Sequence, residues 1–135
     1  MDKIIWDNSF SVGVPTLDKQ HQKIISIINQ LIADPTSDFG SVSVAKILNE
    51  LTHFASEHFI TEEDLLAKFD YPDLPSQRKE HKAFRTRLAG YCMEAMHSNS
   101  AIPLHILAFL KGWWVDHILV KDMDYRPFLA SRDVK

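Results

Sequence analysis

The sequence predicts an all-α protein, an up-down-up-down four-helix bundle with an irregular N-terminal arm. Apolar residues recur at helical spacing in four segments, and short polar or proline-containing connections separate these segments. Short connections make consecutive helices antiparallel neighbours, which gives the up-down-up-down order. We expect residues 1–16 to form the arm and to pack over the bundle, and residues 1–135 to form a single domain.

The first two helices are expected at about residues 17–33 and 42–69. The apolar stripe of the first helix consists of Leu17, Ile24, Ile25, Ile28, Leu31 and Ile32. Pro35 interrupts the pattern after this helix. The second helix is expected to stop before Tyr71-Pro72, because the residue that precedes a proline is disfavoured in the helical conformation.

The third and fourth helices are expected at about residues 75–96 and 103–121, and each begins at a proline. Pro75 and Pro103 suit the first turn of a helix, where the missing N–H would have no partner in any case. The polar residues 97–100 connect the two helices.

Composition and charge argue against several classes of protein. The net charge of −3 gives no general attraction to nucleic acid or to anionic lipid. The single cysteine, Cys92, excludes an internal disulfide and suits a reducing compartment. No segment reads as a signal peptide or a membrane-spanning helix. We therefore expect a cytoplasmic monomer that binds neither nucleic acid nor membrane.

Each of the four helices places a metal-binding side chain within its apolar stripe. These side chains lie three, four or seven positions from apolar residues of the same stripe, and they are His21, His58, Glu62, His81 and His117. The same test places His53, His97 and His105 off the stripes, and we expect them at the surface. One histidine on an apolar face is most simply a hydrogen-bonded core residue, but four of them with a glutamate favour a metal site.

The buried Glu62 needs a positive partner, because burying an unpaired carboxylate costs several kcal/mol. No lysine or arginine lies near it in the stripes, so a metal ion is the economical partner. Asp122 lies five residues after His117, just past the last helical turn, and is expected to fold its carboxylate back to the same centre. Carboxylates with imidazoles suit iron, manganese or zinc, and ligands drawn from four helices are typical of dinuclear centres in bundles.

Four motifs occur in order along the chain. They are LDKQH at 17–21, HFITEE at 58–63, YP at 71–72 followed by HKAF at 81–84, and HI at 117–118 followed by Asp122 and Tyr125. Together with Trp6 and the sequence VGV at 12–14, they make the chain resemble the hemerythrins, particularly the bacteriohemerythrins, over nearly its whole length.

The resemblance implies two iron ions joined by an oxo or hydroxo bridge, and dioxygen or a similar small ligand as the partner. It also implies the ligands: His21 and His58 at the iron with an open position, His81 and His117 at the other iron, and Glu62 and Asp122 as bridges. The implied function is dioxygen binding for storage, delivery or sensing. The alternatives are a di-iron redox enzyme of the peroxidase or oxidase type and a redox- or oxygen-sensing signalling module. The sequence shows no convincing acid or base outside the ligand set, which favours binding over catalysis.

One ligand position departs from the family's pattern. The family has a histidine four residues before His81, and this chain has Gln77, which keeps the same helical face. An amide oxygen is a weaker donor than imidazole, so Gln77 can bind iron weakly, hydrogen-bond a coordinated water or leave the iron with an open position. Our hypothesis is that the change makes this iron more labile and speeds its oxidation. The alternative is a tolerated replacement that leaves ordinary oxygen binding intact.

Aromatic and aliphatic residues near the expected ligands suggest a dry pocket. They are Ile24, Ile25, Phe54, Phe59, Trp113 and Trp114. Core packing alone also accounts for these residues. Tyr125 either reaches the centre or anchors the C-terminal segment to the bundle.

Overall fold

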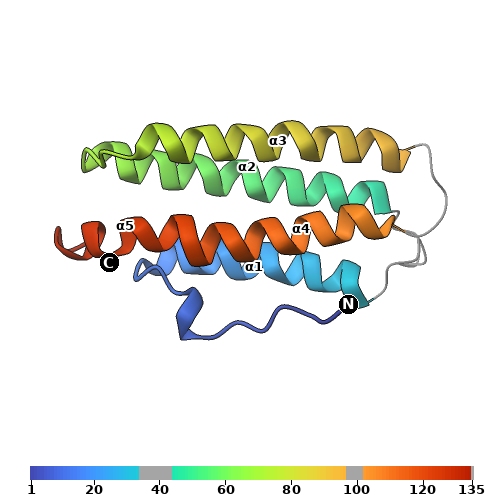
Figure 1. The fold of residues 1–135 in the computed structure, drawn as a ribbon, viewed down its shortest axis with the longest axis horizontal. Helices are drawn as coiled ribbons and strands as arrows, with labels where there is room; N and C mark the ends of the chain where they lie inside the picture. The colour runs from blue at the N-terminus through green and yellow to red at the C-terminus, as the bar shows by residue number, and fades with distance from the viewer. Residues whose placement is uncertain (34–43, 97–101, 135) are drawn as a thin grey trace.

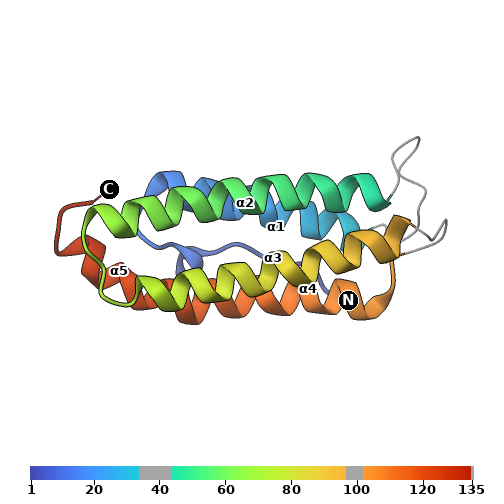
Figure 2. The same ribbon diagram turned by 90° about the horizontal axis from the view of Figure 1, so that it is seen from above.

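The computed structural model describes residues 1–33, 44–96 and 102–134, and these residues form helices with no β-strand. The helices are α1 (Pro15–Ala33), α2 (Val44–Lys68), α3 (Leu74–Met96), α4 (Leu104–Asp116), η2 (His117–Asp122) and α5 (Met123–Ala130). Figures 1 and 2 show the helices aligned side by side with consecutive helices antiparallel, and α4, η2 and α5 follow one another along a single rod. The predicted four-helix bundle is therefore confirmed.

The fourth rod is longer than the sequence pattern predicts. We expected it to end near residue 121, whereas it runs on to Ala130 through η2, a π-helical segment. The sequence signal for this extension is the four-residue spacing of Tyr125 and Leu129. Both residues are buried in the structure. A π-helix pairs residues five apart instead of four, so the apolar stripe shifts its phase at η2 and no longer follows the α-helical repeat.

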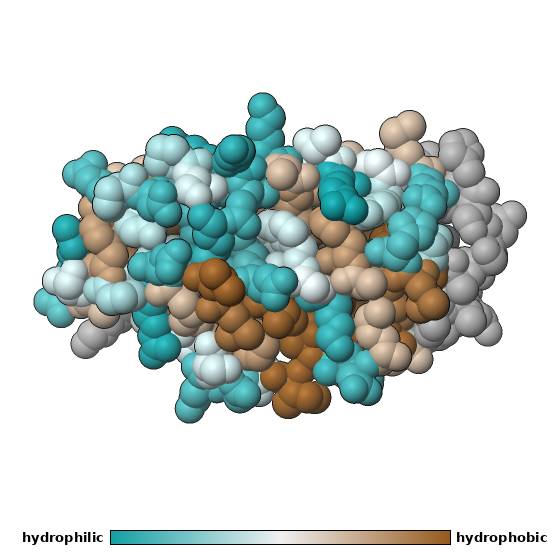
Figure 3. Space-filling view, viewed as in Figure 1, coloured by the Kyte–Doolittle hydropathy of each residue, from teal (hydrophilic) through white to brown (hydrophobic). Residues whose placement is uncertain are grey.

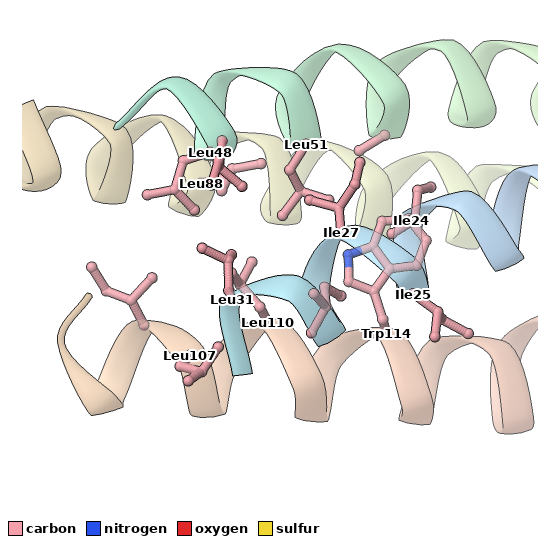
Figure 4. Packing of buried hydrophobic residues seen from close by; sticks show 14 of the residues in the cluster. Ile24, Ile25, Ile27, Leu31, Leu48, Leu51, Leu88, Leu107, Leu110 and Trp114 are labelled. Carbon is pink, nitrogen blue, oxygen red and sulfur yellow. The ribbon is translucent and has the colours of Figure 1, made fainter. Parts of the chain in front are cut away.

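The apolar core is divided into two clusters along the bundle axis. The larger cluster joins all four rods, and Figure 4 shows part of it, with Leu51 of α2, Leu31 of α1 and Leu110 of α4 directed into the bundle. The smaller cluster lies toward the other end and contains Leu17, Leu66, Leu74, Tyr125 and Leu129 with residues of the arm. On α1 and α3 the predicted polar residues fall between members of the two clusters, whereas on α2 and the fourth rod they begin one residue before the last member of the larger cluster, Phe59 or Ile118.

The N-terminal arm is attached to α1 by reciprocal polar contacts. Ile4 donates its N–H to Asn29 Oδ1 and accepts a hydrogen bond from Asn29 Nδ2, at 2.8 and 2.9 Å. Nearer to α1, Asp18 accepts hydrogen bonds from the Val12 N–H and the Ser11 hydroxyl. Gly13 follows directly after Val12 and has φ of +80°, a conformation that favours glycine. The arm therefore packs on the bundle as expected.

The surface of the molecule is mostly polar on the side seen in Figure 3. Hydrophobic residues gather there in one patch that extends from the fourth rod to the arm. Within the described ranges, no helix combines the length and apolar character that crossing a lipid bilayer requires.

The fold makes a direct prediction about core packing. Leu51 is fully buried, whereas Leu104 at the start of α4 is 72% exposed. We expect Leu51→Ala to lower the free energy of unfolding by about 2–5 kcal/mol, because it leaves a cavity between helices. Leu104→Ala is the matched control and should change it by less than about 0.5 kcal/mol. Chemical denaturation of both variants tests this, and equal effects would contradict the assigned core.

Candidate metal centre

A layer of polar side chains crosses the bundle between the two apolar clusters. Its members are each at most 2% exposed, and they are His21, His58, Glu62, Gln77, His81, His117 and Asp122. α1 supplies one of them, α2 and α3 supply two each, and η2 supplies the last two. The structure thus brings together all seven residues that the sequence singled out.

Local helix geometry explains why these residues face the same way. His58 and Glu62 lie four apart on α2, as Gln77 and His81 do on α3, and that spacing puts both members of a pair on one face. His117 and Asp122 lie five apart, and η2 brings them to one face because π-helical pairing matches that interval. The Asp122 carboxylate reaches the centre as expected, but our expectation that it lies past the last turn was wrong, since the helix is continuous through it.

Glu62 places one carboxylate oxygen on each side of the layer. Its Oε1 lies 3.0 Å from His81 Nε2, and its Oε2 lies 3.2 Å from His58 Nε2. A single carboxylate therefore faces imidazoles from α2 and α3 with different oxygens.

The two carboxylate oxygens of Asp122 also lie close to imidazoles from different helices. Its Oδ1 lies 3.1 Å from His117 Nε2, and its Oδ2 lies 3.2 Å from His21 Nε2. On one side of the layer, the Nε2 atoms of His81 and His117 approach each other to 3.2 Å. Both carboxylates thus have the arrangement that bridging between two cations requires.

The donor atoms fall into two groups that share a carboxylate. The first group is His21, His58, Glu62 and Asp122. The second group is Glu62, His81 and His117. Within each group the candidate ligand atoms lie within 4.8 Å of one another, so each group can hold a metal ion.

Hydrogen bonds to the outer nitrogens orient two of the imidazoles. His58 Nδ1 lies 2.8 Å from Gln20 Oε1, and the amide nitrogen of Gln20 donates to Thr61. His81 Nδ1 lies 2.8 Å from Glu63 Oε2. These acceptors favour a proton on Nδ1, which leaves Nε2 free to bind a metal.

The outer partners were not identified as such from the sequence. Gln20 and Glu63 lie within the LDKQH and HFITEE motifs, but helical periodicity marks only the side chains that face the bundle axis. Glu80 is a further outer neighbour, with its Oε1 3.6 Å from His117 Nδ1 and its Oε2 3.4 Å from Lys121. Gln20, Glu63 and Glu80 each lie one residue before or after an inward-facing member of the layer, and this position is the sequence signal that could have identified them.

Histidine side chains compensate the negative charges of the two carboxylates in the layer. Burial raises the pKa of Glu62, but the His58 imidazole and hydrogen bonds from His117 outweigh it and hold that pKa well below its ordinary value. Burial opposes protonation of His117, but Asp122 and Glu62 outweigh it and raise its pKa to about 10. A proton on imidazole thus compensates the carboxylates, and a metal cation can replace it.

Tyr125 reaches the centre from α5. Its hydroxyl donates a 2.9 Å hydrogen bond to Glu62 Oε2, and its ring is fully buried. Burial raises the pKa of Tyr125 well above its ordinary value, and the charges of Asp122 and Glu62 raise it further. The phenol therefore stays protonated and fixes the orientation of the carboxylate.

Aromatic rings enclose the layer on the side of the larger cluster. Phe59 stacks on His81 with ring centroids 3.9 Å apart, and it lies nearly parallel to Trp114 at 5.5 Å. Trp113 stacks on His117 at 4.4 Å. Phe54 is only half-buried and lines a surface pocket with Lys23, so it is not part of this enclosure.

The unsatisfied polar atoms of the layer test whether a metal fits. Among the described residues, the layer's buried atoms that lack a hydrogen-bond partner are His21 Nδ1 and Nε2, His58 Nε2, Glu62 Oε1, Gln77 Oε1, His117 Nδ1 and Asp122 Oδ2. Such groups are costly unless something binds them. Most are nitrogen or carboxylate atoms that face the centre, so the donor set suits a pair of transition-metal ions.

The remaining histidines lie apart from the layer. His53 and His105 are exposed, as predicted. His97 falls outside the described residues.

Comparison with known proteins gives a consistent result. The profile of the hemerythrin HHE cation binding domain matches residues 12–129. A hemerythrin-like protein of Naegleria gruberi is 36% identical over 124 residues, which is 92% of each chain. A bacteriohemerythrin of Clostridium acetobutylicum is 28% identical over 125 residues, covering 90% of this chain and 97% of its own. A crystal structure of wild-type hemerythrin shares the fold, with a TM-score of 0.82 at 24% identity over 93% of this chain and 97% of that one.

The family match spans both ends of the polar layer, from before His21 to beyond Asp122. The layer supplies the buried histidine and carboxylate groups that can hold cations. The chain therefore belongs to the hemerythrin family, and it is a non-haem di-iron protein that binds dioxygen.

Proposed function

We propose that this chain binds dioxygen reversibly, for storage, delivery or sensing, and that the polar layer is its binding centre. The observation that carries the proposal is the division of each carboxylate between the two groups of donors. Glu62 and Asp122 each present one oxygen to each group, so both are suited to bridge two iron ions.

The proposed ligands follow from the same geometry. One iron would be held by His21 and His58 and the other by His81 and His117, with the two carboxylates shared. When bound, the two irons would supply the electrons that dioxygen binding needs, and a hydroxo group held with them would supply the proton. The protein contributes fixed Nε2 donors, because Gln20 and Glu63 hold the opposite edges of their rings.

The enclosure supports oxygen binding because it excludes water. Trp114 is fully buried and lies beside both histidines of the first group, with ring centroids 6.4 Å from His21 and 6.0 Å from His58. A small apolar molecule can be accommodated in such surroundings more readily than water or an anion. The enclosure therefore protects ferrous iron from the ligands that promote its oxidation.

The pKa of the phenol at the centre also fits oxygen binding better than catalysis. Tyr125 is the phenol that hydrogen-bonds to Glu62, and its raised pKa makes it a poor acid at neutral pH. A peroxidase or oxidase needs an acid or base whose pKa lies near the working pH. Tyr125 does not meet that requirement, so it gives no support for an enzymatic function.

Reversible oxygen binding is tested by the optical spectrum of the iron-loaded, reduced protein. We expect a charge-transfer band to appear on exposure to air and to disappear when oxygen is removed under argon. Repeated cycles should give the same amplitude, because the enclosed centre limits oxidation. Immediate conversion to a diferric spectrum that argon does not reverse would contradict storage or delivery.

Gln77 is expected to shorten the lifetime of the oxygenated form. Gln77→His replaces a neutral amide with an imidazole, a donor better suited to ferrous iron, and should slow autoxidation by about tenfold. The decay of the oxygenated band in the variant and in the unmodified chain measures the effect. Equal decay rates with unchanged iron coordination would contradict it.

A further inference from the structure

The Gln77 side chain has a defined orientation inside the polar layer. Its amide nitrogen lies 3.2 Å from the Lys121 carbonyl oxygen and 3.3 Å from Asp122 Oδ1. A carbonyl and a carboxylate only accept hydrogen bonds, so the amide must direct its NH₂ group toward them. The opposite orientation would set three oxygens against one another.

This orientation leaves the amide oxygen without a partner. Gln77 is 1% exposed, and its Oε1 is buried with no hydrogen bond. A buried amide oxygen of this kind is costly unless something binds it. The NH₂ group is already held by η2, so the amide cannot turn to relieve the cost without losing both of its hydrogen bonds.

The second group of donors is the one beside Gln77. This group has three members, whereas the first group has four. Gln77 lies one helical turn before His81 on α3, and its amide contacts the same Asp122 oxygen that lies 3.1 Å from His117 Nε2. The unpartnered oxygen therefore belongs to the side of the layer that holds His81 and His117.

We propose that Gln77 is a metal ligand through Oε1 and completes the second group. The inference rests on the proposed dinuclear centre and adds a specific ligand to it. The NH₂ group acts as the anchor, and η2 supplies the anchoring carbonyl at Lys121. The second metal position then has a neutral oxygen donor in addition to His81, His117 and the shared carboxylates.

This composition makes the two metal positions unequal. Amide oxygen is a weaker donor for transition metals than imidazole, so the second position should bind its metal less tightly than it would with a histidine at position 77. The same difference accounts for the expected effect of Gln77 on oxidation of the centre.

A positioning role for Gln77 makes a different prediction. If its only function were to hold Asp122 through the NH₂ group, its loss would disturb the first group, because Asp122 belongs to that group. Loss of a ligand would instead affect the second position alone. Two substitutions separate these roles: Gln77→Leu removes the oxygen and the NH₂ group, and Gln77→Glu keeps the oxygen donor but removes the NH₂ group.

The test is a titration of the metal-stripped chain with Co²⁺, whose visible absorption follows each binding step. We expect two steps in the unmodified chain. Gln77→Leu should weaken the second step at least about tenfold and leave the first unchanged. Gln77→Glu should bind the second Co²⁺ at least as tightly as the unmodified chain. Gln20→Leu is the matched control, and it should weaken the first step because Gln20 orients His58.

The outcomes are distinct. Fewer than two Co²⁺ ions in the unmodified chain would contradict the proposed dinuclear centre itself. Two ions with an unchanged second step in Gln77→Leu would overturn the ligand assignment, as would a weakening of both steps in that variant. A second step that is weaker in Gln77→Glu than in Gln77→Leu would also overturn it. In the two Gln77 variants, the first step serves as an internal measure of folding.

Discussion

The structure depends on the compensation of two buried carboxylates. Glu62 and Asp122 are fully buried, and among the described residues their ion-pair partners are all histidines. Buried charge of this kind is tolerated only when cations and hydrogen bonds surround it. The four rods satisfy this condition by directing an imidazole from each toward the same layer, and the iron ions of the family take the place of the compensating protons.

The apolar parts of the bundle are arranged around this requirement. One cluster packs on each side of the polar layer, so the helices are held at both ends of the centre. Phe59 and Trp114 form the boundary on one side, while Tyr125 belongs to the other cluster and donates directly to Glu62. The packing that stabilises the fold is thus the same packing that keeps the donors fixed and water away from them.

Helical spacing predicted the bundle and most of the layer because burial follows the α-helical repeat. His21, His58 and His81 are recognisable as polar residues at apolar positions. Asp122 was assigned to the centre for its distance from His117, but its location in a continuous π-helical segment was not predicted, because five-residue spacing falls outside the α-helical repeat. The outer partners Gln20 and Glu80 depend on contacts between neighbouring helices, which a single stripe does not reveal.

The central claim is that two metal ions lie within this layer, each bound by both carboxylates. It is tested most directly by anomalous diffraction at the iron absorption edge, from crystals loaded with ferrous iron in the absence of oxygen. The account predicts two peaks between Glu62 and Asp122, one beside His21 and His58 and the other beside His81 and His117. A single peak, or peaks outside the polar layer, would contradict it.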